Sequence, residues 1–410
     1  MKQQPEPPKT DSENSTIRAT HATAFSDEPF IFDVGSLVDT LRLVRDGRKA
    51  RGKRYRLVTV LVLMLLAKLC GHDTPEAMAD WAKVRAEGLA KMLNLSRRSM
   101  PHSTTLLRVL RNAISPEELE EAIRVFMTRQ IRKLNSDQIC IDGKQIRGTQ
   151  DKEGEGNVYL LGAYAPGVGV MLMQMELGVG EGELSVAPRL LKSLELRGKV
   201  VTGDAGFAQR NLSVQIVEAG GEYVWKVKAN QPRLLEDIEL LFGPPLPTLP
   251  GSSTPKTDFQ TAKDQSCANG RVDSRTLTTS SQLQVSSDWP NLKQVFRIET
   301  DSLNKKTGKR TPSISYGVTS LCAAEADPRR LLKIARGHWG IEGGSHQRRD
   351  TTFNEDGCDL QRGHAAHIMA ILNNIAISLL VLAGFRNVAH GRRTISADPE
   401  KAFSLLVFAK

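Results

Sequence analysis

The sequence predicts a small all-helical domain followed by a larger α/β domain built on a mixed sheet. Between Phe32 and Leu134 apolar residues recur at helical spacing, and helix-start signals such as Asp73-Thr74-Pro75-Glu76 divide them into segments. From Asn135 onward short apolar strands alternate with helices, which indicates a sheet covered by helices. Between Pro232 and Asp327 turn residues separate short β-type runs, which predicts a β-rich insertion.

These changes predict four parts, and 410 residues are enough for two folded domains with tails. Residues 1–30 are polar and rich in Pro, Ser, Thr and Glu, so we expect them to stay disordered. The parts that follow are a helical, basic domain at 31–134, an α/β domain at 135–385 with its insertion at about 232–327, and a C-terminal tail at 386–410.

The positive charge is concentrated in the helical domain. The chain carries a net charge of +10, and residues 31–134 hold 20 Lys and Arg against 11 Asp and Glu. The densest run is Arg45 to Arg56, with seven basic residues and one acid, Asp46. Such an excess favours a polyanionic partner, nucleic acid or an anionic surface. For this run taken alone, a solvated basic loop is an equal alternative.

Cysteine usage and hydropathy predict a cytoplasmic protein with no membrane partner. The five cysteines are scattered without metal-type spacing, which suits a reducing compartment. Two apolar runs, Leu57–Ala67 and Ile375–Phe385, are each shorter than the roughly 20 residues that span a bilayer. We therefore expect both runs to form buried core helices.

The α/β domain is predicted to begin with a three-stranded antiparallel meander. Its strands lie in DQICIDG, NVYLLGAYA and VGVMLMQMELG, and a helix follows at Leu184–Leu196. KVVTGDAG then predicts a short buried strand, NLSVQIVEAGG a helix, and EYVWKVKAN a further strand.

Three carboxylates fall where a metal site could form. Asp142 closes the first strand and Asp204 closes the later buried strand, at the sheet edge where ligands bind. If the strands are neighbours, the two carboxylates repel each other and need a cation between them. Oxygen ligands beside a phosphate substrate favour Mg²⁺, and Glu342 on a helix is the candidate third acid. Taken alone, an Asp before Gly is more often a turn residue.

Six motifs then resemble, in order, the H-repeat-associated group of insertion-sequence transposases, within the large Asp–Asp–Glu class. They are IDGKQIRGT from Ile141, VTGDAGFAQRNL from Val201, GGEYVWKVKANQP from Gly220, NGRVDSR from Asn269, SYGVTSL from Ser315, and RGHWGIEGGSHQRRDTTFNEDGCDLQRG from Arg336. The helical region resembles the domain associated with that group, so the resemblance covers roughly residues 32 to 385.

The resemblance implies a DNA transposase with a ribonuclease-H-like catalytic core. Asp142, Asp204 and Glu342 would be its catalytic acids and metal ligands, holding two Mg²⁺ ions with Mn²⁺ as a substitute. The expected reaction is phosphodiester cleavage and strand transfer on double-stranded DNA, both element ends and target. A homodimer is expected in the synaptic complex, in the nucleoid of the bacterial cytoplasm.

Nine residues are candidates for contacts with DNA. The resemblance places Asn230, Arg271 and Arg275 in motifs near the DNA, and Arg349 stands where the wider class has a lysine. The alternative for Asn230 is a turn that ends a strand. The alternative for Arg271 and Arg275 is a β-hairpin with ordinary surface arginines. The helical domain adds Arg48, Lys49, Arg51, Lys53 and Arg54.

The sequence also departs from the group's pattern after two of the acids. The histidine usual after the second acid is missing from Ala205-Gly206-Phe207, and Gly343-Gly344 follows Glu342. Each glycine costs about 1 kcal/mol in a helix interior, so we expect the helix bearing Glu342 to be bent or frayed. These departures leave a second hypothesis open, an inactive or co-opted relative that holds DNA without cutting it.

Overall fold

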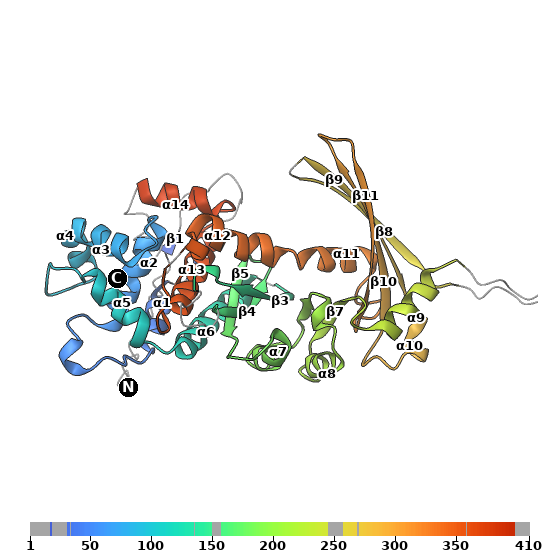
Figure 1. Cartoon of the computed structure of the whole chain (residues 1–410), viewed down its shortest axis with the longest axis horizontal. Helices are drawn as coiled ribbons and strands as arrows, with labels where there is room; N and C mark the ends of the chain where they lie inside the picture. The colour runs from blue at the N-terminus through green and yellow to red at the C-terminus, as the bar shows by residue number, and fades with distance from the viewer. Residues whose placement is uncertain are drawn as a thin grey trace, which may run out of the picture. The chain divides into compact units, whose positions relative to one another are not determined.

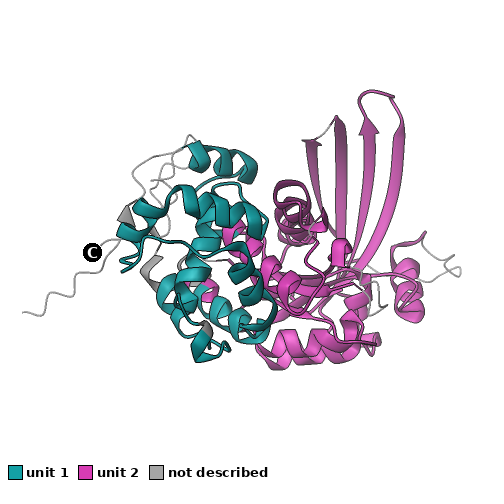
Figure 2. Cartoon of the chain, turned by 60° about the vertical axis from the view of Figure 1, so that its left-hand side comes forward, with its two compact units in different colours: residues 1–126, 378–410 teal, residues 127–377 magenta. Residues whose placement is uncertain are grey.

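The computed structural model describes residues 17–18, 31–32, 34–134, 136–149, 157–244, 257–268, 270–357 and 359–397. The chain divides into two compact units: unit 1 comprises residues 1–126 with 378–410, and unit 2 comprises residues 127–377 (Figure 2). Most of the predicted tail at 1–30 lies outside the described residues.

Unit 1 is a group of helices around one buried helix, α2. Helix α2 is apolar on all sides, which is typical of a helix surrounded by others. The predicted start of α3 is confirmed, because Thr74 Oγ1 accepts a hydrogen bond from the Ala77 backbone at 3.2 Å and Pro75 occupies the first turn. The elements of unit 1 are β1 (Ile17–Arg18), β2 (Ile31–Phe32), α1 (Val34–Arg42), η1 (Ala50–Gly52), α2 (Leu57–Leu69), α3 (Pro75–Val84), α4 (Ala86–Met92), α5 (Ser103–Asn112), the first part of α6 (Pro116–Leu134), and α14 (Val388–Ala397).

The C-terminal segment contributes a packed helix to unit 1. Arg392 of α14 is 7% exposed, its Nε donates to the Lys68 carbonyl at 3.0 Å, and its Nη2 meets Asp73 at 2.8 Å. A buried guanidinium with these partners fixes α14 against the rest of the unit. The predicted tail at 386–410 is therefore corrected for residues 388–397, which are ordered, and the residues beyond them lie outside the described part.

Unit 2 is built on one mixed sheet of nine strands (Figure 1). In spatial order they are β5 (Val170–Glu176), β4 (Tyr159–Ala165), β3 (Gln138–Gln145), β6 (Val200–Gly203), β7 (Glu222–Val227), β11 (Arg310–Thr319), β10 (Gln294–Asn304), β9 (Arg271–Ser280) and β8 (Gln260–Ala268). Strand β6 pairs in parallel with both β3 and β7, and the remaining neighbours are antiparallel.

The predicted strand pairings are confirmed in the first half of this sheet. Strands β3, β4 and β5 form the antiparallel meander, and the short strand KVVTG becomes β6, fully buried as expected between two parallel neighbours. The predicted β-rich insertion at about 232–327 contains strands β8 to β11. Its strands extend the same sheet, because β11 pairs with β7 through Val318 and Trp225.

Helices cover both faces of the central sheet. Helices α7 and α8 lie on one face and α11 on the other (Figure 1). Leu331 and Ile334 of α11 are buried against Val200 and Val224, and each such aliphatic side chain contributes about 1.5–3 kcal/mol. The helices and turns of unit 2 are η2 (Arg147–Thr149), α7 (Glu183–Lys192), η3 (Ala205–Phe207), α8 (Arg210–Glu218), α9 (Pro232–Phe242), α10 (Leu283–Ser286), α11 (Pro328–Gly337), η4 (Glu342–His346), α12 (Gln347–Phe353), η5 (Glu355–Gly357) and most of α13 (Ala365–Leu382).

Among the described residues one helix, α13, has the length and apolar composition of a membrane span, and 94% of it is buried inside the protein. It extends ten residues upstream of the apolar run predicted from Ile375. Its burial fits the predicted core helix.

Candidate active site

One face of strand β3 meets the chain that runs from α11 to α12. Alternate residues of a strand point to the same face, and on β3 these include Gln138, Asp142 and Lys144. Gln138 Nε2 donates to the Ile334 carbonyl of α11 at 2.8 Å, and Lys144 Nζ meets Asp350 Oδ1 of α12 at 2.6 Å. Asp142 lies between these two contacts. The strand and the helical segment therefore run side by side along the candidate site.

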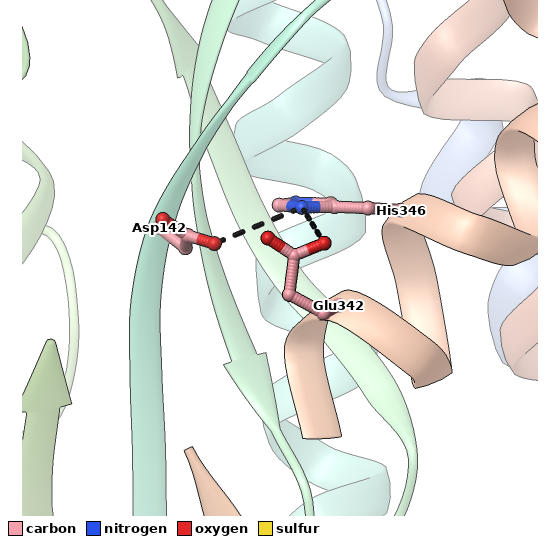
Figure 3. A group of neighbouring side chains, drawn as sticks. All are labelled: Asp142, Glu342 and His346. Atoms are coloured by element: carbon pink, nitrogen blue, oxygen red, sulfur yellow. Dashed lines mark ion pairs between the residues drawn. The ribbon is translucent and has the colours of Figure 1, made fainter. Parts of the chain in front are cut away.

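Asp142, Glu342 and His346 form a compact cluster (Figure 3). One ligand atom from each lies within 4.8 Å of the others. The Nδ1 atom of His346 is 3.8 Å from Asp142 Oδ2 and 3.6 Å from Glu342 Oε2. The side chains of Asp142 and His346 are 19% and 7% exposed, whereas that of Glu342 is 54% exposed. The cluster thus lies at the surface with one open side.

The turn that carries Glu342 and His346 is a π-helical turn, η4. Its residues include Gly343 and Gly344, and the π-helical turn interrupts the regular α-helical hydrogen bonding at that point. Gly344 faces β4 so closely that a Cβ atom there would lie 1.9 Å from the Tyr164 hydroxyl. Gly343 has nothing within 4 Å of the same position. Gly344 therefore allows the close approach that brings Glu342 to Asp142.

Asp142 is strongly perturbed by its surroundings. Burial, followed by the like charge of Glu342, raises its pKa to about 7, and Glu183 and Asp204 act in the same direction. An acid whose pKa is raised by neighbouring carboxylates is poised to exchange a proton for a cation.

His346 supplies a neutral ligand to the cluster. Burial, and then the charges of Arg349 and Lys144, lower its pKa to about 3. The ring is therefore uncharged at neutral pH, so the contacts drawn in Figure 3 join carboxylates to a neutral imidazole. A neutral imidazole is the form that binds metals. His346 was not among the predicted site residues, although it follows Glu342 by four positions, the spacing of one helical face.

Asp204 directly follows the neighbouring strand β6 and lies outside this cluster. Cys140 pairs with Thr202 in the parallel register, and Asp142 and Asp204 each follow two residues later. Asp204 is exposed, and its Oδ1 accepts a hydrogen bond from the Gly206 backbone at 2.8 Å. Asp142 does not end its strand as predicted. Strand β3 continues to Gln145 because the antiparallel partner β4 extends beyond the end of β6.

Asn230 and Gln231 hold the segment that follows Asp204. Asn230 Nδ2 donates to the Ala205 carbonyl at 2.7 Å, and Gln231 Nε2 donates to the Ala208 carbonyl at 2.9 Å. These bonds fix the turn that carries Asp204. The structure thus gives Asn230 a positioning contact, and its predicted contact with DNA stays a prediction.

A further acid, Glu183 at the start of α7, lies against the backbone of β3. A Cβ atom on Gly143 would lie 1.8 Å from Glu183 Oε1, which accepts a hydrogen bond from the Tyr159 hydroxyl at 2.6 Å. Because no side chain stands at position 143, the carboxylate of Glu183 comes close enough to raise the pKa of Asp142. The sequence motif around Asp142 did not indicate that Glu183 would lie nearby.

Arg349 is not available to DNA, so its predicted contact is corrected. Its side chain is 1% exposed, and its Nη2 lies 2.6 Å from Glu355 Oε1. Asn373 Nδ2 donates to the other oxygen of Glu355 at 2.8 Å. A guanidinium enclosed in this way stabilises the packing of α12 and cannot reach a phosphate.

The other predicted DNA contacts fall into two groups. Arg48 donates to both oxygens of Asp46 at 2.9 Å and to the Tyr55 carbonyl at 2.7 Å, and Arg275 meets Asp273 at 2.7 Å. These two arginines are partly buried and bind protein groups. The exposed group is Lys49, Arg51, Lys53, Arg54 and Arg271.

Comparisons with known proteins show which family this chain belongs to. The family described as "Transposase DDE domain" matches residues 134–379, and the family described as "DDE_Tnp_1-associated" matches residues 38–127. The chain is 27% identical to "Putative protein YbfL" and 26% identical to "H repeat-associated putative transposase YhhI", both of Escherichia coli K12. Each alignment covers 85% of this chain and 91% of the relative. A solved structure, "Cryo-EM structure of piggyBac transposase synaptic complex with hairpin DNA (SNHP)", is similar with a TM-score of 0.43 and 12% identity, over 90% of this chain and 78% of that one.

Proposed function

Because the chain belongs to the Transposase DDE domain family and is an insertion-sequence transposase, we propose that Asp142, Asp204 and Glu342 are its catalytic acids. The observation that carries this proposal is the approach of Glu342 to Asp142, which lie 200 residues apart in sequence. Asp204 directly follows β6, the strand next to β3, and we propose that it completes the set.

The donor set fits a divalent cation, on which enzymes of this family depend. The ligand atoms of Asp142 and Glu342 lie within 4.8 Å of each other, and burial followed by the like charge of Glu342 raises the pKa of Asp142 to about 7. We propose that the ions are Mg²⁺, two in number, with Mn²⁺ as a substitute. When bound, such ions supply activation of the attacking oxygen and stabilisation of the leaving oxygen in phosphodiester cleavage and strand transfer.

The chain's own residues hold this site in shape. Lys144 ties β3 to α12 through Asp350, and Gly344 lets η4 approach β4. We propose that His346 acts as a neutral fourth ligand, which would strengthen binding of Mn²⁺ relative to Mg²⁺ because imidazole suits softer ions.

We propose further that the catalytic core is ribonuclease-H-like. The order β5-β4-β3-β6-β7, with an antiparallel meander followed by two parallel strands, supports this assignment. The substrates would be the double-stranded element ends and target DNA, brought together by a homodimer in the bacterial cytoplasm at the nucleoid. Unit 1, which holds the run Arg45–Arg56, would bind element ends.

A second candidate function is DNA binding without cleavage. Its support is that Asp204 lies outside the compact cluster and forms a capping contact with Gly206. In that case the basic surfaces would still bind DNA while the site would not cut it.

A cleavage assay on linear DNA that carries the element's terminal repeats distinguishes DNA cleavage from DNA binding alone. Wild type with Mg²⁺ is expected to cut at the element end, and Asp142→Asn is expected to lose about a thousandfold or more of the rate, the equivalent of several kcal/mol of electrostatic stabilisation. Glu218→Gln, an exposed acid on α8, is the control and should cut normally. Equal cleavage by wild type and Asp142→Asn would overturn the assignment of the acids. Binding without cleavage by wild type would favour the second function.

A further inference from the structure

The distal parts of strands β8 to β11 form an arm that extends beyond the helices of unit 2 (Figures 1 and 2). Near the central sheet these strands are buried, as at Leu277 and Phe296. Beyond the pair Ile298 and Leu277, no residue of 271–276 in β9 or 299–304 in β10 is buried. An antiparallel sheet normally buries one face. The distal part of the arm therefore contributes little to the hydrophobic core, and core packing does not explain its length. Binding of a partner at its end would explain it.

The turn at the end of the arm is basic and is closed by hydrogen bonds. Residues 303–310 read LNKKTGKR, with four cations and no acid, and residues 305–310 are all exposed. Asn304 Oδ1 accepts hydrogen bonds from the backbones of Lys306 at 2.9 Å and Thr307 at 3.2 Å. Gly308 has a φ of +67°, which lets the turn close. Hydrogen bonds therefore hold the backbone that carries these cations.

The neighbouring hairpin turn adds to the same surface. The Lys305 backbone donates to the Gly270 carbonyl at 2.9 Å, which joins the two turns. Arg271 lies opposite Asn304 in the register and is exposed.

The acids nearest to these turns are engaged by the arm itself. Asp273 meets Arg275 at 2.7 Å and accepts a hydrogen bond from Ser302 at 2.6 Å. Asp301 pairs with Arg310. These carboxylates therefore sit beside their own partners on the strands and leave the end of the arm positive.

We propose that the arm tip, defined as Arg271, Lys305, Lys306 and Lys309, binds the sugar-phosphate backbone of duplex DNA. This inference rests on the proposed function, and it names a contact surface beyond the active site and unit 1. Lysines act as point charges toward phosphates, and such contacts position a duplex without reading its sequence. Four strands spaced by about 4.8 Å span roughly 14 Å. That width exceeds the major groove of about 12 Å, so the tip meets phosphates across the groove and does not enter it.

The test is equilibrium binding of the full chain to fluorescent duplex DNA in EDTA, over a range of KCl concentrations. The variant is Lys305→Gln/Lys306→Gln/Lys309→Gln. The control is Lys192→Gln/Lys293→Gln/Lys333→Gln, which removes the same charge from exposed positions elsewhere in unit 2. One probe has a random sequence and the other carries the element's terminal repeat, so element and target contacts are compared.

The tip variant should bind both probes at least about tenfold more weakly than the control near 0.1 M salt, and its salt slope should fall by up to about 2.7, since each phosphate contact contributes about 0.9. Equal affinity and slope for the two variants would overturn the inference while leaving the transposase assignment intact. Wild type that binds neither probe would overturn both. Loss confined to the terminal-repeat probe would also contradict it, because backbone contacts carry no sequence information.

Discussion

The two charged regions of unit 2 are built in opposite ways. Along β3 and α12 two cations are buried and paired, as Lys144 meets Asp350 and Arg349 meets Glu355. At the arm tip, Lys305 and its neighbours are exposed. Cations that hold a geometry are taken out of water and paired, whereas cations that can meet an anionic ligand stay solvated. The difference predicts where a lost charge affects folding and where it affects binding only.

The same contrast separates the two basic runs of the chain. Arg48 lies two residues from an acid and is held by it, so part of the predicted DNA surface in unit 1 is structural. The turn at 303–310 has no acid, and its lysines are exposed. Charge density along a sequence therefore does not say which cations a ligand can reach.

The largest expected effect on the free energy of unfolding is at the buried ion pair of Arg349 and Glu355. Arg349→Met leaves a buried carboxylate without its cation and should lower the free energy of unfolding by about 3–5 kcal/mol. Urea unfolding followed by circular dichroism measures it. Arg189→Met, which breaks an exposed pair with Glu181, is the control and should change stability by less than about 1 kcal/mol. An Arg349→Met protein as stable as the control would contradict the contrast between buried and exposed charges.

The next effect is a pH dependence of the metal-free protein. Burial and the Glu342 charge raise the pKa of Asp142 from 3.8 to about 7, so between these values the folded state binds more protons than the unfolded state. Stability without metal should therefore fall as pH rises from about 4 to about 7, by at most about 4 kcal/mol. Asp142→Asn should remove this loss. Equal pH profiles for the two proteins in EDTA would show that burial and the Glu342 charge do not raise the pKa of Asp142.

A smaller effect is expected at Lys144. Lys144→Met should destabilise the protein by about 1–3 kcal/mol, because Asp350 loses its partner, and should weaken Mn²⁺ binding measured by calorimetry. The double variant Lys144→Met/Asp350→Asn should be less destabilised than the two single changes combined. If the losses of unfolding free energy in the two single variants simply add in the double variant, the Lys144–Asp350 pair does not fix α12 against β3.

The smallest effect on folding is expected at the arm tip. The triple Gln variant at Lys305, Lys306 and Lys309 should unfold within about 0.5 kcal/mol of wild type, because exposed side chains away from packing contribute little. Thermal unfolding of the variant, measured without DNA, checks this. A loss of unfolding free energy as large as that of Lys144→Met would show that the lysines of the arm tip stabilise the fold.

Much of the site could be predicted, because it follows from strand ends and local spacing. The pattern before Asp142 and Asp204 predicts a strand in each place, which β3 and β6 confirm, and the structure adds that the two strands are neighbours. His346 was missed, since its role depends on which face of the helical turn meets β3. Glu183 was missed because only the absence of a side chain at Gly143 brings it near Asp142.

By itself, the sequence determined the elements and their order, because apolar periodicity and capping act over a few residues. The antiparallel meander was determined at that level. Only the tertiary structure decided which arginines are enclosed, as Arg349 is, and which cations remain in water. That choice depends on burial by residues far away in the chain, such as Asn373 beside Glu355, and no local pattern encodes it.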